Sequence, residues 1–171
     1  CGPLALSEPF FEGGEVGPTF FSEPDLTEMV RVADDGGYQV VIHAQGDLAV
    51  AGAQDAIGSV LDGGANLLRH RIDNNVVLTP DIVGRSGELG IVSVAFAAWP
   101  TCADLPTTEF SEAYGENWRA LLDANPGAHI AWHGDDPWVP PFNPLIDLYS
   151  FVTRAEIAED GSVCEPEAWL A

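Results

Sequence analysis

Four short segments with apolar residues recur along the chain and predict strands, and the first and third of them are rich in β-branched residues. They cover residues 38–42, 67–74, 90–96 and 128–136. The first run follows Gly36 and Gly37 and ends directly before His43. Most of these runs are nearly continuous rather than alternating, which is typical of strands in a parallel sheet that is covered by helices.

Segments with apolar residues at helical spacing lie before and between these runs. They predict helices over residues 23–34, 48–61, 79–89 and 111–125. Ser22 is a suitable N-cap for the first helix, and Asp25 falls in its first turn. Strands and helices therefore alternate, which predicts the α/β fold class with parallel βα repeats.

Polar side chains stand where the predicted strands end. His43 follows the first strand, Asn74 ends the second, and His133, Asp135 and Asp136 close the fourth. Parallel α/β folds carry their chemistry at the carboxyl ends of the strands, so these residues form a candidate site. Because neighbouring strand residues point to opposite faces, we expect His70 to point away from this site and to pack against a helix.

Five motifs occur in one order: HAQGD (43–47), RHRID (69–73), WRALLD (118–123), GDD (134–136) with PFNPL (141–145), and VTR (152–154). In this order they resemble the carboxyl-terminal half of the barrel in metal-dependent amidohydrolases of the amidohydrolase-3 group, the YtcJ-like or N-substituted formamide deformylase-like enzymes. The resemblance covers residues 6–170. It implies a partial (β/α)8 TIM barrel in which this chain supplies strands five to eight.

The resemblance also implies a divalent metal, with zinc as the expected ion. By position, His43 matches a metal-binding histidine, and Asp136 matches a metal-binding aspartate that also accepts the proton of the attacking water. Asn74 stands where the family has a further histidine, and asparagine is a poor zinc ligand. The ligands of the amino-terminal half have no counterpart here. We therefore expect that residues 1–171 do not build the full metal site alone.

Substrate contacts are predicted at the same end of the sheet. Trp99 lies in the loop after the third predicted strand and is a candidate wall of the substrate site. Together with Asn74 and His133 it completes the predicted substrate-binding set, and the predicted partner is a small-molecule substrate.

The composition of the chain predicts a strongly acidic surface. The chain has 27 acidic and 6 basic residues, a formal charge of −21, and yet 46% hydrophobic residues. All six basic residues are arginine. A folded domain with so acidic a surface suggests a salt-rich setting that screens the repulsion, so we interpret the protein as halophilic; an ordinary acidic bacterial protein is the alternative. Nucleic acid is excluded as a partner because phosphate binding requires basic surface.

Length and hydropathy limit the organisation of the chain. No apolar run has membrane-spanning length and no secretory signal is present, so we expect a soluble protein without a membrane partner, with the cytoplasm as the favoured location. A complete TIM barrel usually takes about 250 residues, more than the 171 here. We predict a single α/β domain with a loop-rich lead-in (1–21), βα repeats (22–154) and a polar tail (155–171).

Two functions follow from these expectations. The first is a metal-dependent hydrolase of the amidohydrolase type that acts on amide or other C–N bonds as part of a larger barrel. The second is a truncated or degenerate relative that binds a ligand or partner without catalysis. In either case a half barrel leaves strand edges open, so we predict a homo-oligomer or a complex with the missing half.

Overall fold

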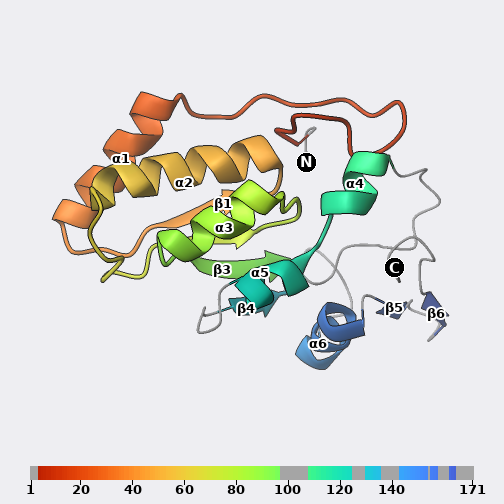
Figure 1. Cartoon of the computed structure of the whole chain (residues 1–171). Coiled ribbons are helices and arrows are strands. Elements are labelled where there is room, and N and C mark those ends of the chain that lie inside the picture. Colours follow the sequence, from red (N-terminus) through yellow and green to blue (C-terminus); the bar gives the residue numbers. More distant parts are fainter. Residues whose placement is uncertain are drawn as a thin grey trace.

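A four-stranded parallel sheet lies at the centre of the molecule (Figure 1). The computed structural model describes residues 4–96, 108–124, 130–135, 143–153, 155–157 and 162–164. The strands are β1 (Val41–Ala44), β2 (Arg71–Asn74), β3 (Val92–Phe96) and β4 (Ile130–His133), and they lie in the order β1-β2-β3-β4. All three pairings are parallel, which confirms the predicted α/β fold with parallel βα repeats.

Helices precede, separate and follow the strands. They are α1 (Glu23–Asp35), α2 (Asp47–Leu61), α3 (Pro80–Glu88), α4 (Glu109–Tyr114), α5 (Trp118–Ala124) and α6 (Pro144–Thr153). Ser22 caps α1, as predicted, by accepting a hydrogen bond from the Asp25 N–H. Among the described residues, no helix is long and apolar enough to cross a membrane.

The main hydrophobic core lies between one face of the sheet and helices α2, α3 and α5, which follow one another along that face (Figure 1). Ile72 of β2 is fully buried there opposite Ile42 of β1, and Ala44 of β1 and Ala95 of β3 are buried in the same core. Val50 and Ile57 of α2 and Leu121 of α5 pack against them. Burial of a Val, Ile or Leu side chain stabilises the fold by roughly 1.5–3 kcal/mol.

The predicted helix over residues 111–125 is wrong in one respect, because the segment forms two helices. The Leu78 N–H donates to the Tyr114 carbonyl at 2.8 Å, and the Glu116 N–H donates to the Val76 carbonyl. Glu116 adopts a positive φ of 50°, which an α-helix does not allow. Pairing with the segment after β2 therefore separates α4 from α5, and local periodicity contains no signal for such a distant partner.

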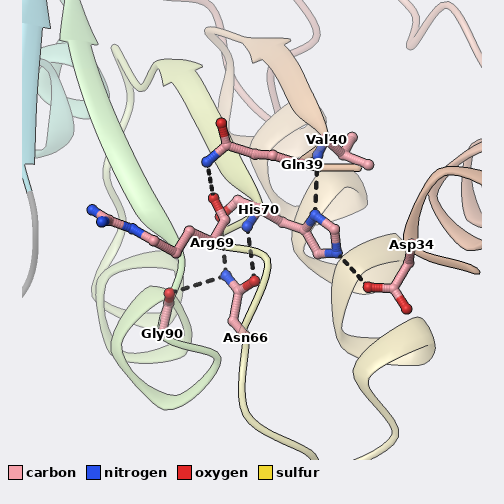
Figure 2. A network of polar contacts seen from close by, with 7 residues as sticks. All are labelled: Asp34, Gln39, Val40, Asn66, Arg69, His70 and Gly90. Atoms are coloured by element: carbon pink, nitrogen blue, oxygen red, sulfur yellow. Dashed lines mark hydrogen bonds and ion pairs between the residues drawn. The ribbon is translucent and has the colours of Figure 1, made fainter. Parts of the chain in front are cut away.

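His70 joins the amino ends of the first two strands to helix α1 (Figure 2). Its ring is fully buried, and Nδ1 accepts a hydrogen bond from the Val40 N–H at 3.0 Å. The neutral ring then carries its proton on Nε2, which donates to Asp34 Oδ1 of α1 at 2.9 Å. His70 thus points away from the candidate site and contacts a helix, as the sequence predicted.

The loop before β2 is fixed by Asn66 (Figure 2). Its Oδ1 accepts from the His70 N–H at 2.8 Å, and its Nδ2 donates to the carbonyls of His70 and Gly90. Gln39 donates to the Arg69 carbonyl, and Arg69 itself has a positive φ of 58°. These contacts hold residues 66–69 as a loop, so β2 begins later than the run of residues 67–74 predicted.

The two ends of the described chain add structure that the periodicity did not predict. Leu6 and Phe10 of the amino-terminal segment form a second apolar cluster with Val76, Val77 and Phe96, and Phe110 of α4 completes it. Near the other end, β5 (Glu156–Ile157) and β6 (Val163–Cys164) pair antiparallel within the predicted polar tail.

The acidic surface leads to a testable expectation about salt. Four arginines each lie within 3.0 Å of an aspartate or glutamate oxygen: Arg31, Arg71, Arg85 and Arg119. Their positive charges are therefore already paired, and the negative charges of the many remaining acidic side chains are not neutralised. The Debye length falls from about 30 Å at 0.01 M salt to about 3 Å at 1 M, which screens the net repulsion. We expect the melting temperature to rise between these conditions by roughly 2–8 °C, equivalent to about 1–2 kcal/mol.

Thermal melts followed by circular dichroism in sodium chloride test this expectation, with a neutral osmolyte at matched osmolality as the control. A flat or falling melting temperature would contradict both the screening argument and the halophilic interpretation.

Candidate active site

The face of the sheet opposite the main core carries the candidate chemistry. Ile42 and Ala44 of β1 contact the core, so Val41 and His43 point to the other side. Arg71 and Asp73 of β2 do the same, because Ile72 between them is buried in the core. We call the side of the sheet that carries Val41, His43, Arg71 and Asp73 the open face.

His43 is the third residue of β1, near the carboxyl end of that strand. Its side chain is exposed, and its ring makes no hydrogen bond with any of the described residues. In the parallel register His43 stands opposite Asp73, which in turn stands opposite Val94 of β3. The imidazole is therefore accessible to a ligand at the edge where parallel folds place their chemistry.

Asn74 ends β2 and lies opposite Ala44, one residue beyond the row of His43. It has a positive φ of 82° and is 1% exposed. Among the described residues, neither its amide oxygen nor its amide nitrogen has a hydrogen-bond partner. Asn75 follows with a φ of 48° and donates from Nδ2 to the carbonyls of Ile72 and Val94. This pair of asparagines ends the strand, with Asn74 enclosed rather than exposed beside His43.

His133 ends β4 and faces the same side as Phe96, its register partner, with the two ring centroids 5.6 Å apart. Its Nδ1 lies 3.7 Å from Asp135 Oδ1, and its Nε2 is buried without a partner among the described residues. A pocket of about 320 Å³ lies at this end of β4. It is lined by Trp132, His133, Gly134, Asp135, Pro144 and Asp147.

Comparison with known proteins identifies the family. Residues 2–169 match the model of the amidohydrolase family. The chain belongs to the amidohydrolase family. The narrower resemblance to YtcJ-like or N-substituted formamide deformylase-like enzymes stays a prediction.

Two solved structures resemble this chain, each with a TM-score of 0.65. One is an uncharacterized metal-dependent hydrolase from Pyrococcus furiosus, with 21% identity over 84% of this chain and 29% of that chain. The other is an uncharacterized metal-dependent hydrolase from Pyrococcus horikoshii OT3, with 20% identity over 80% of this chain and 27% of that chain. The chain thus spans less than a third of either structure, and its sheet and helices match part of an amidohydrolase barrel. No protein of curated function matches significantly.

The described residues do not fit a complete metal site. In the ranges that the structure describes, no group of three or more His, Cys, Asp or Glu side chains gathers closely enough to hold a metal ion. His43 offers one accessible imidazole, whereas the carboxamide of Asn74 is enclosed. Asp136 and Trp99, predicted as metal ligand and substrate wall, lie outside the described residues. A functional metal site therefore requires donors beyond those described.

The Gly-Asp pair after β1 has a structural role. A Cβ on Gly46 would meet the Ala5 carbonyl oxygen far inside van der Waals contact, so only glycine fits there. Asp47 is buried, and its Oδ1 accepts from the Ser7 N–H at 2.9 Å. The motif thus holds the amino-terminal segment against the carboxyl edge of β1.

Two acidic residues near the carboxyl edge were not singled out from the sequence. Asp73 points to the open face beside His43, and buried Asp147 of α6 lies against Gly134 in the pocket. The alternation of β2 around buried Ile72 could have identified Asp73. The contact of Asp147 with Gly134 depends on how α6 packs and has no sequence signal.

Proposed function

We propose that this chain forms part of a metal-dependent amidohydrolase that hydrolyses amide or other C–N bonds in a small-molecule substrate. The observation that carries the proposal is His43, an accessible imidazole at the carboxyl end of a parallel strand in a chain of this family. The names of the two structural neighbours as metal-dependent hydrolases support it. In this proposal the rest of a larger barrel supplies the remaining half of the site.

The proposed metal is a divalent ion, with zinc favoured because its preferred ligands include imidazole nitrogen. His43 is the proposed ligand from β1, and Asp136 is the proposed ligand and proton acceptor after β4. Asn74, His133 and Trp99 are the proposed substrate contacts. Support for His133 comes from the pocket that it lines at the end of β4.

Zinc binding by the full chain tests the proposal. We expect isothermal titration calorimetry of metal-free protein to show weak zinc binding, because this chain supplies only part of the site, and we expect His43→Ala to abolish it, because His43 is the exposed imidazole among the described residues. Val41→Ala is a matched control, since it shortens a side chain on the same face without removing a donor. Wild-type protein that binds no zinc, or His43→Ala protein that binds as wild type does, would contradict the proposed metal site.

The second candidate function is ligand or partner binding without catalysis. Asn74 favours it, since a neutral and enclosed carboxamide occupies the position where the resemblance implies a metal-binding histidine. Absence of zinc binding in the experiment above, with a folded protein, would favour this second function.

We also propose that the chain associates with a second copy or with a complementary half barrel, and not with nucleic acid or membrane. Among the described strands β1 stands at the edge of the sheet, and Val41 is 49% exposed. An open strand edge is a template for further pairing. We expect light scattering coupled to size exclusion to give at least twice the chain mass of 18.2 kDa. If the partner is instead a complementary half barrel, we expect this chain to capture it. A monodisperse monomer across salt concentrations would contradict this proposal.

A further inference from the structure

Three polar residues of the open face stand close together on two adjacent strands. His43 and Asp73 are direct cross-strand partners, and both point away from the helices. Arg71 lies two residues before Asp73 and therefore on the same side. Paired strands are about 4.7–4.9 Å apart, so the side chains of direct partners are within reach of one another.

The carboxylate of Asp73 is held from one side only. Its Oδ2 accepts a hydrogen bond from Arg71 Nη2 at 3.0 Å, and its side chain is 18% exposed. Its Oδ1 is buried and has no partner among the described residues. Buried acceptors nearly always have a donor, and leaving one unpaired costs about 1–3 kcal/mol. Asp73 is thus a fixed carboxylate with one oxygen still able to accept.

His43, the direct cross-strand partner of Asp73, is the side chain that can donate a hydrogen bond to this oxygen. Its ring is exposed and makes no hydrogen bond with the described residues, so it is free to rotate about its side-chain torsions. We propose that Asp73, held by Arg71, is a positioning residue for His43. Its Oδ1 accepts one ring N–H, which fixes the tautomer of the imidazole and presents the other nitrogen, with its lone pair, to a ligand.

This inference rests on the proposed function in one respect, namely that His43 is the side chain that binds the ligand. The alternative role for Asp73 is purely structural, as the partner of Arg71 in a half-exposed ion pair worth about 0–1 kcal/mol. The two roles differ in one observable, because only a positioning carboxylate changes the tautomer of His43.

Nuclear magnetic resonance of the full chain distinguishes the two roles. Long-range proton–nitrogen spectra, recorded where imidazoles are neutral, report which ring nitrogen of His43 carries the proton. We expect one tautomer to dominate in the wild type, and we expect Asp73→Ala to shift the nitrogen resonances to those of a free imidazole. Asp73→Asn keeps an acceptor without the charge and should give an intermediate shift, and it also serves if Asp73→Ala folds poorly.

Asp135→Asn is the matched control, since Asp135 lies near His133 and outside the row of His43. It should leave the His43 resonances unchanged. A His43 ring with the tautomer distribution of free imidazole, or one that is unchanged in both folded Asp73 variants, would overturn the inference.

Zinc titration separates this inference from the proposed function. If the wild type binds zinc, Asp73→Ala should weaken the affinity by roughly 10–100-fold, the usual effect of losing the carboxylate behind a histidine ligand. If the wild type binds no zinc, the proposed metal site fails, while the tautomer measurement still decides the role of Asp73.

Discussion

Replacement of His70 by alanine is expected to lower the free energy of unfolding by about 3 kcal/mol. The ring is fully buried, and its removal leaves the Val40 N–H without its acceptor and Asp34 without its donor (Figure 2). It also leaves a cavity where α1 meets the amino ends of β1 and β2. In a chain of this length the loss corresponds to a fall in melting temperature of roughly 6–12 °C.

Chemical denaturation and thermal melts measure this effect, and His43→Ala is the matched control. It removes the same ring from an exposed position without hydrogen bonds, so its effect should lie within about 0.5 kcal/mol of zero. His70→Asn should recover part of the loss, because its side-chain oxygen can still accept from the Val40 N–H. Equal melting of His70→Ala and wild-type protein would show that the contacts in Figure 2 do not stabilise the fold.

Asn74 is enclosed on the side of Ala44, but the longer imidazole of histidine can reach past the end of β2 to the carboxyl edge. Asn74→His is therefore expected to tighten zinc binding by roughly tenfold, equivalent to about 1.4 kcal/mol. Imidazole is a far better zinc donor than a carboxamide. Histidine is also among the residues that tolerate a positive φ, such as the 82° of Asn74. Since the amide of Asn74 has no partner among the described residues, the exchange breaks no hydrogen bond that the structure describes.

Calorimetric titration with zinc measures this change, and a thermal melt of the same sample checks folding. Asn75→His is the matched control, because Asn75 uses its Nδ2 to bind the carbonyls of Ile72 and Val94. That variant should lose stability and gain no zinc affinity. A folded Asn74→His protein with unchanged affinity would mean that position 74 does not face a metal.

The strands and helices could be predicted because their signals are local. The apolar runs placed all four strands of the sheet, and the region around Ser22 placed the start of α1 correctly. The same patterns misplaced boundaries where distant contacts intervene. Residues 67–70 resemble a strand but form a loop, because Asn66 binds the backbone of His70 and Gly90.

The candidate site was predictable only in part. Position at a strand end identified His43, and alternation along β2 identified His70 as a residue that packs against a helix. Alternation also places Asn74 on the same side as His70 and Ile72, away from His43, but the near-complete burial of Asn74 depends on what packs around the end of β2. The partnership of His43 with Asp73 depends on strand register, which single-strand patterns do not specify.

The sequence by itself determined the fold class, the order of strands and helices, and the family, because hydrophobic periodicity and short motifs are written in consecutive residues. Tertiary structure alone decided where elements stop and which polar atoms meet. The pairing of Val76 and Leu78 with residues 114–116 split one predicted helix into two. Such contacts join residues that are far apart along the chain, and their free energy outweighs local helix propensity, which differs by only about 0–0.7 kcal/mol per residue among ordinary residues.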